Sequence, residues 1–305
     1  MADRRGVLLL ASGVLGSALV VLALVLLLAG GAPLTHPGLP SAPGAVLWLL
    51  AAAPLAHLVL GTATVAGGLL VGGHLGEPTG SVRGIALVWA ATTMLTFTLL
   101  GVEQHALGVP VSQFPASPQA NGLFMAVLVA GFTAYAAPSA PRALAPLAVL
   151  GLVPPLLTGH VRTAAVPWLT GSALVLHVAA AATWVGGLAA VGWLLVRGRP
   201  WGRALRSYSP IALVAATVVA VSGVVVALSR IGSVGDLVGS GYGVIVLAKV
   251  AALVALVACG YVQRRIVLAA DPPSRRAFLL VGGAEIIVMA LTFALAAGLS
   301  QTPPP

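Results

Sequence analysis

Histidines are the side chains of this sequence best suited to bind a metal ion. The chain has six; His160 closes one long apolar run, and His177 lies near the start of the next. Imidazole is the commonest protein ligand for transition metals and suits copper, zinc and iron. A short connection between the two runs would bring both rings together, so we interpret His160 and His177 as candidate metal ligands. The alternative for either ring alone is a hydrogen bond to a backbone carbonyl at a helix end.

Two charged residues, Lys249 and Glu285, fall well inside apolar runs. An ionisable group in such a segment is costly, which makes each of them a functional candidate. One interpretation is a buried ion pair that only orients two helices. The other places both residues on a translocation path, with Glu285 as a relay for protons or metal ions.

The apolar run that contains His177 also holds Trp184 and the pair Gly186-Gly187. His177 and Trp184 are seven residues apart, so they share one face of a helix. Small residues let neighbouring helices approach closely inside a membrane. The glycine pair therefore predicts a close helix contact beside the candidate ligands.

Composition determines the environment in which these residues act. Hydrophobic residues form 59% of the 305-residue chain, charged residues form 7%, and the mean hydropathy is +1.08. A soluble globular domain has about 25% charged residues. These values exclude a water-soluble enzyme and a disordered regulator, and the single cysteine, Cys259, excludes disulfides and thiolate clusters. The expected surrounding is a lipid bilayer, and no enzymatic activity is expected.

The apolar runs predict an all-α, polytopic bundle of transmembrane helices, because each span needs roughly 20 mostly apolar residues. We expect nine spans, at 7–30, 46–73, 84–101, 121–137, 143–159, 171–196, 208–229, 242–263 and 277–299. The run 7–30 is longer than the apolar part of a signal peptide, so we expect a retained first helix. Residues 1–150, in which about five spans begin, form one predicted group of helices, and residues 151–305, with about four spans, form a second.

Arginines indicate the orientation of this bundle. With a cytoplasmic N-terminus, nine spans place twelve arginines inside and only two, Arg162 and Arg230, outside, as the positive-inside rule requires. The inner ones are Arg4, Arg5, Arg83, Arg142, Arg197, Arg199, Arg203, Arg206, Arg264, Arg265, Arg275 and Arg276. The C-terminus then lies outside. The net charge of +9 thus reflects topology, and since no continuous basic stripe is present, no nucleic-acid partner is expected.

The same topology places five of the six histidines in the outer half of the protein. His57 falls in the outer half of its span, and Glu103 and His105 fall at an outer helix end. We therefore add these three residues to His160 and His177 as candidate ligands of one outer metal site.

Residues from about 150 to 305 resemble the copper resistance D (CopD) family. The resemblance rests on Thr158-Gly159-His160, Leu176-His177 with Trp184-Val185-Gly186-Gly187-Leu188, Ser222-Gly223-Val224-Val225, Gly241-Tyr242-Gly243, Lys249, Gln263-Arg264-Arg265, Arg275-Arg276, Glu285 and Thr302-Pro303-Pro304. The earlier part of the chain, around Gly38-Leu39-Pro40 and the second span, looks like actinobacterial relatives in which such a module is fused to a cytochrome oxidase assembly domain.

This resemblance implies an integral protein of the bacterial inner (plasma) membrane that imports copper or delivers it to cuproenzymes. It implies that His160 and His177 are copper ligands and that Trp184 with Gly186-Gly187 is a packing signature beside them. The implied partners are the copper ion, the lipid bilayer, and a periplasmic copper chaperone or a cytochrome oxidase assembly factor. The sequence has no nucleotide-binding motif, so transport driven by ATP within this chain is not expected.

Two other functions use the same residues. Haem is held by histidines of facing helices in some bundles, and His57 and His177 descend from the same side of the membrane. A haem-binding membrane redox protein is therefore one alternative. The other is a metal-free scaffold that assists oxidase assembly through helix contacts.

Overall fold

The computed structural model describes residues 18, 20–24, 44–73, 79–158, 164, 166–267, 269 and 273–302. These residues form helices and connecting turns, with no strand among them, which confirms the all-α class. The α-helices are α2 (Gly44–Gly72), α3 (Thr79–Ala106), α4 (Pro118–Ala136), α5 (Leu144–Leu152), α6 (Pro167–Val196), α7 (Trp201–Leu228), α8 (Val234–Gly239), α9 (Gly241–Val262) and α10 (Arg275–Gln301). Short 3-10 turns occur at Phe114–Ala116, Pro141–Ala143 and Pro154–Leu157, and a π-helical turn, Gln263–Val267, continues α9.

Seven of the described helices are long and apolar enough to cross a membrane: α2, α3, α4, α6, α7, α9 with its π turn, and α10. The predicted span 143–159 contains only the nine-residue α5 between 3-10 turns. Pro154 and Pro155 lack backbone N–H donors, so two consecutive helical hydrogen bonds would be missing there, and α5 ends at Leu152. The predicted span 7–30 lies mostly outside the described residues, although 18 and 20–24 are helical. Nine spans and the positions of both termini therefore stay predictions.

Helix ends follow local sequence signals. The side chains of Ser117, Ser240 and Ser274 accept hydrogen bonds from backbone N–H groups three residues later and begin α4, α9 and α10. Such caps satisfy donors that the first helical turn leaves free. After α6, Gly198 has a φ of +66°, a conformation that glycine adopts without steric cost and that ends the helix.

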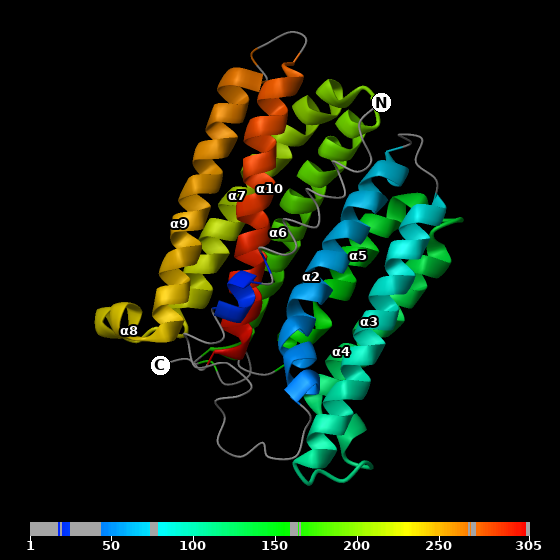
Figure 1. The fold of residues 1–305 in the computed structure, drawn as a ribbon, viewed down its shortest axis with the longest axis vertical. Helices are drawn as coiled ribbons and strands as arrows, with labels where there is room; N and C mark the ends of the chain where they lie inside the picture. Colours follow the sequence, from blue (N-terminus) through cyan, green and yellow to red (C-terminus); the bar gives the residue numbers. More distant parts are fainter. Residues whose placement is uncertain are drawn as a thin grey trace.

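The helices form two adjacent groups (Figure 1). One group contains α2, α3, α4 and α5, and the other contains α6, α7, α9 and α10. Helix α2 lies at the junction, where it packs against both α6 and α10. Ala18 and Leu22 are buried over the contact between α2 and α10. The predicted boundary between residues 150 and 151 falls inside α5, just before the chain crosses to the second group.

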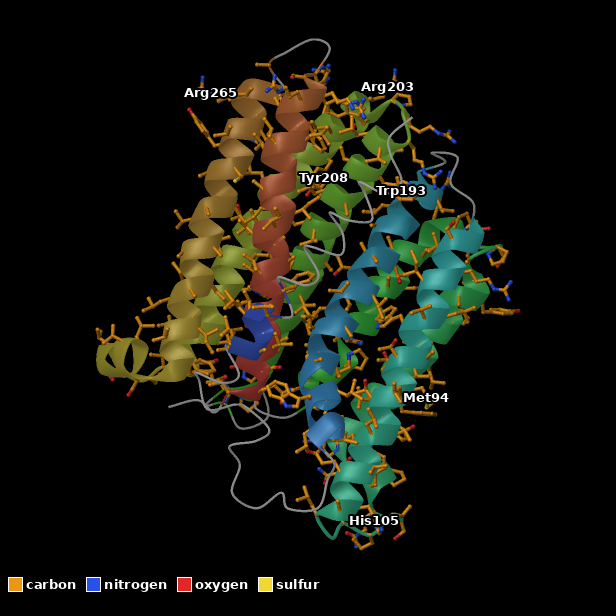
Figure 2. All side chains as sticks on the ribbon, in the orientation of Figure 1. Met94, His105, Trp193, Arg203, Tyr208 and Arg265 are labelled. Carbon is orange, nitrogen blue, oxygen red and sulfur yellow. The ribbon has the colours of Figure 1, made fainter. Side chains whose placement is uncertain are left out.

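Arginines cluster at one end of the bundle. Counting the short α5, successive helices from α2 to α7 run in alternating directions, as do α9 and α10, and Arg203 and Arg265 lie at the end opposite His105 (Figures 1 and 2). The Arg264 guanidinium donates a 2.7 Å hydrogen bond to the Ser209 carbonyl, which ties the π turn to α7. We call this the arginine-rich end; the positive-inside rule places such an end on the cytoplasmic side.

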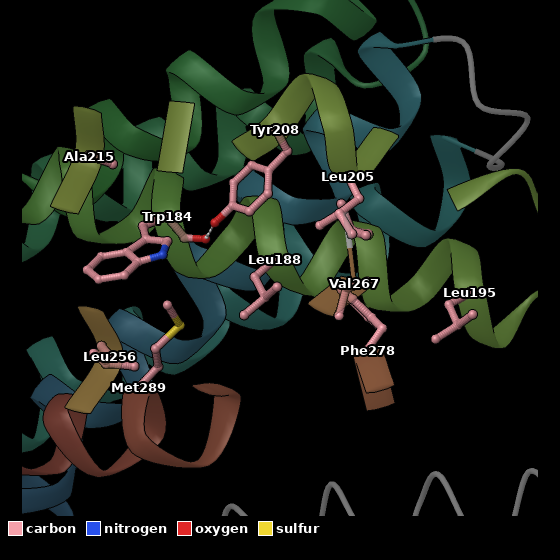
Figure 3. Close-up of a cluster of buried hydrophobic side chains, with 11 residues drawn as sticks. Trp184, Leu188, Leu195, Leu205, Tyr208, Ala215, Leu256, Val267, Phe278 and Met289 are labelled. Atoms are coloured by element: carbon pink, nitrogen blue, oxygen red, sulfur yellow. Dashed lines mark hydrogen bonds between the residues drawn. The ribbon is translucent and has the colours of Figure 1, made fainter. Parts of the chain in front are cut away.

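The second group of helices is joined by an apolar cluster (Figure 3). Trp184 from α6, Tyr208 from α7, Leu256 from α9 and Met289 from α10 are all buried in it. The Tyr208 hydroxyl donates a hydrogen bond to the backbone carbonyl of Trp184. Without this bond the Tyr208 hydroxyl would be buried in an apolar core with no hydrogen-bond partner.

Two adjacent glycines set the spacing of α6 from its neighbours. A Cβ at Gly186 would lie 3.0 Å from Val65 Cγ1 and 3.3 Å from the Thr62 carbonyl oxygen, both on α2. A Cβ at Gly187 would overlap the Tyr208 ring. Glycine is required because the backbone of α6 approaches α2 on one side and an aromatic ring on the other.

Replacing Gly187 with alanine is expected to destabilise the protein by about 1–3 kcal/mol, because the Tyr208 ring that it would meet is held by a hydrogen bond and cannot move freely. Thermal unfolding in detergent measures the effect. Gly192→Ala is the matched control on the same helix, since nothing lies within 4 Å of its added methyl group. Alanine has a higher helix propensity than glycine, so Gly192→Ala should leave the stability unchanged or raise it slightly. Equal losses in both variants would contradict the assigned contact.

Candidate functional site

His177 is positioned by two groups on the neighbouring helix α7. Its Nδ1 lies 3.1 Å from the Val219 carbonyl oxygen and 3.1 Å from the Ser222 hydroxyl oxygen. The imidazole also packs against Gly223, where an added Cβ would lie 3.4 Å from the ring. Groups within about one turn of α7 therefore hold the Nδ1 side of the ring.

These partners determine the tautomer of neutral His177. A backbone carbonyl can only accept, so Nδ1 must carry the proton that it donates to Val219. The Ser222 hydroxyl donates to the Val218 carbonyl, so its oxygen also accepts from Nδ1. Nε2 then keeps its lone pair. An imidazole oriented by hydrogen bonds at one nitrogen with the other nitrogen free is the usual arrangement of a histidine that ligates a metal.

Lys249 on α9 interacts electrostatically with the partly buried His177. A positive charge near the imidazole opposes the binding of a second cation. Of the two interpretations of Lys249 and Glu285, the ion pair is not present; both side chains are described, and no salt bridge joins them. Lys249 thus influences the histidine in the first half of α6, while Glu285 belongs to a different cluster.

Glu285 is buried on α10, with 2% of its surface exposed. Its carboxylate accepts a hydrogen bond from the Trp184 side chain, and its Oε2 atom has no hydrogen-bond partner. Trp184 thus contacts both α7, through its backbone carbonyl, and α10, through its indole. This arrangement makes Trp184 a link between helices.

His57 is held in the other group of helices. The Trp89 indole on α3 donates a 3.0 Å hydrogen bond to His57 Nδ1, and the two rings lie 5.4 Å apart. The lone pair of Nδ1 is thus already used. In neutral His57 the proton is on Nε2, which is buried without a well-formed hydrogen bond; the Leu152 backbone is a polar group that acts on the ring. Neither nitrogen offers a free lone pair to a metal.

The remaining candidate ligands lie apart from His177. Glu103 and His105 are in the last turn of α3, and His105 is exposed at the far end of the first group (Figure 2). His160 is outside the described residues. Within the part of the chain that the structure describes, no three His, Cys, Asp or Glu side chains come together as a metal site. The predicted five-residue outer cluster is therefore not assembled by these residues.

The same geometry bears on the haem alternative. His57 contacts α3 and the backbone of α5, whereas His177 is hydrogen-bonded to α7 and interacts electrostatically with Lys249 of α9. The two rings use different neighbours, so their contacts give no support to a haem held between them.

Several groups that shape these sites give only weak sequence signals. Trp89, Val219 and Tyr208 act through partners 24 to 42 residues away in the chain. Gln263 is buried with an unpartnered Nε2, although it precedes two arginines. The one signal that the sequence offers for it is a polar side chain at the end of a long apolar run.

Fold and site together define a multi-pass membrane protein with titratable groups inside its helical bundle. Residues 202–299 match the family model of copper resistance protein D (CopD). This match supports a CopD-family protein, and the family implies a copper resistance membrane protein. No curated protein and no solved structure matches the chain.

The matched segment covers α7, α9 and α10, including Ser222, Lys249 and Glu285. His160, His177 and Trp184 precede it. The two groups that orient His177, on α7, lie inside the match. The resemblance of the earlier segments to a fused oxidase assembly protein stays a prediction.

Replacing Trp89 with phenylalanine is expected to destabilise the protein by about 1–3 kcal/mol, because buried His57 loses its one well-formed hydrogen bond. A double-mutant cycle with His57→Leu separates this bond from lost packing and should show coupling between the two residues. Copper binding by purified protein should not change in either variant. A loss of copper binding in His57→Leu alone would contradict the structural role assigned to His57.

Proposed function

We propose that this protein carries copper across the bacterial inner membrane, by import or by delivery to a copper enzyme, and that His177 is a copper ligand in the outer half of the bundle. The observation that carries the proposal is the orientation of the imidazole by Val219 and Ser222, which leaves Nε2 free. Those two groups lie in the segment that matches the copper resistance family. Copper is the substrate here and not a resident cofactor.

The place of His177 in α6 supports this function. Ten residues separate it from the start of the helix at Pro167, or about 15 Å at 1.5 Å per residue. The ring therefore lies below the outer end of α6, opposite the arginine-rich end. A cation entering from the outer side meets this imidazole before it reaches the middle of the membrane.

His160 is the proposed second ligand. It precedes the first residue of α6 by seven positions, in the connection between α5 and α6. Imidazoles are suitable donors for copper, and a second one raises affinity beyond that of a single ring. Both ligands must be unprotonated to bind the metal.

Copper binding by detergent-purified protein tests the two ligands. His177→Ala is expected to weaken binding at least tenfold, or by about 1.4 kcal/mol, and the double variant with His160→Ala should abolish it. His105→Ala is the matched control, since this exposed histidine at the far end of α3 should leave binding unchanged. Cellular copper accumulation then distinguishes the two roles. The double variant should lower accumulation if the protein imports copper, and should leave it unchanged if the protein delivers copper to an enzyme. Unchanged binding in the double variant would overturn the site.

Lys249 provides a second and independent test. If copper binds at His177, removing the nearby positive charge should tighten binding, because the cation no longer meets like charge. Lys249→Met keeps most of the side-chain volume and is expected to increase affinity several-fold. Arg230→Met, at the outer end of α7, removes a charge elsewhere and serves as the control. Weaker binding in Lys249→Met would instead place Lys249 in a stabilising role and contradict the proposed geometry.

A further inference from the structure

A polar cluster around Glu285 takes no part in the proposed copper site. It lies near Trp184, seven residues or about 10 Å farther along α6 than His177. Only 2% of the Glu285 surface is exposed, and its Oε2 atom has no partner. A buried oxygen without a partner is unusual in a native protein and calls for an explanation.

The groups that face Glu285 come from three neighbouring helices. The Trp184 indole on α6 donates to the carboxylate, and Tyr208 on α7 and Cys259 on α9 interact with it electrostatically. The contact of α10 with α2 is apolar; it is formed by Ala294 and Ala297 of α10 and by Ala51 and Leu55 of α2. Among the described residues, no lysine or arginine forms a salt bridge with Glu285.

Gln263 connects this cluster with the arginine-rich end. Its buried Nε2 lacks a partner and lies 3.6 Å from the position of a Cβ on Gly282. Gly282 is three residues before Glu285 on α10, or about 4.5 Å nearer the arginine-rich end. An unpartnered donor beside Gly282 and an unpartnered acceptor on Glu285 thus lie at neighbouring turns of α10.

A carboxylate without a cation is expensive in a membrane interior, whereas the neutral acid is not. Among the described residues, Glu285 has one neutral donor beside it, the Trp184 indole, and no positive charge acts on it. Deprotonation therefore requires that another cation enter the cluster or that the group open towards water. A group with these properties binds a proton in one state of the protein and releases it in another.

We propose that Glu285 is a proton-binding site. The proton enters and leaves through the arginine-rich end, past Gln263. Its release accompanies the movement of copper through the second group of helices. In the exchange, the O–H bond of the acid breaks, the proton leaves towards the cytoplasmic side, and the carboxylate left behind compensates the entering cation. When copper leaves, the carboxylate takes up a proton again, and no electron is transferred. The link to copper rests on the proposed function, whereas the proton site itself does not.

Dicyclohexylcarbodiimide tests the proton site directly, because this apolar reagent adds to protonated carboxyl groups in apolar surroundings and leaves a stable adduct. Mass spectrometry of the purified wild type should locate the adduct at Glu285, with labelling that declines as pH rises. The chain has only six acidic residues, so each of the others serves as an internal comparison. Glu103→Gln should leave labelling at Glu285 unchanged, and Glu285→Gln should remove it. Labelling of the surface carboxyls without Glu285 would overturn the proposal.

Coupling to copper is tested with proteoliposomes that contain a pH-sensitive dye. Wild-type protein should release protons when copper is added, and Glu285→Gln, which keeps an oxygen to accept from Trp184, should release none. Copper binding at equilibrium should be weaker in that variant than in wild type, because binding and proton release are reciprocally linked and glutamine has no proton to release. Proton release by Glu285→Gln equal to that of wild type would overturn the coupling. If no copper binds to either protein, the proposed function fails, while the carbodiimide result still decides the proton site.

Discussion

The close approach of α6 to two neighbours at adjacent glycines is the constraint on which the rest of the structure depends. At Gly186 the helix meets α2, which joins the two groups of helices, and at Gly187 it meets the Tyr208 ring of α7. Because the ring packs directly against Gly187, its hydroxyl reaches the Trp184 carbonyl, and α6 and α7 become fixed relative to each other. With α6 and α7 fixed in this way, the Val219 carbonyl and the Ser222 hydroxyl lie beside His177, two turns nearer the N-terminal end of α6 than Trp184.

Hydropathy was sufficient to predict the class of fold and most of the spans. Seven predicted runs correspond to long apolar helices, and serine caps and the Pro154-Pro155 pair account for several of their ends. Copper resistance family membership was also predicted, on a resemblance wider than the segment that the family model matches. The number of spans and the first helix, by contrast, depend on residues that the structure describes only in part.

Side-chain partners could not be predicted from the same pattern, for a physical reason. These helices are apolar on nearly every side, so periodicity does not reveal which face is turned towards a neighbour. The rotation of α2 decides whether His57 meets Trp89 or the other helix group, and nothing local to His57 encodes that choice. The sequence allowed an ion pair between Lys249 and Glu285, yet the packing of α9 and α10 directs Lys249 to His177 and Glu285 to Trp184.

The π-helical turn at the end of α9 has a consequence for the surface of the bundle. A π turn holds about one residue more than an α turn, so it shifts every side chain beyond it around the helix axis. Here the shift leaves Gln263 buried while Arg264 reaches the α7 backbone and Arg265 lies over the Tyr261 ring. Loss of one residue from this turn would rewind it as ordinary α-helix and rotate both guanidinium groups by about 100°. The buried amide of Gln263 and the guanidinium groups of Arg264 and Arg265 thus lie within a single helical turn.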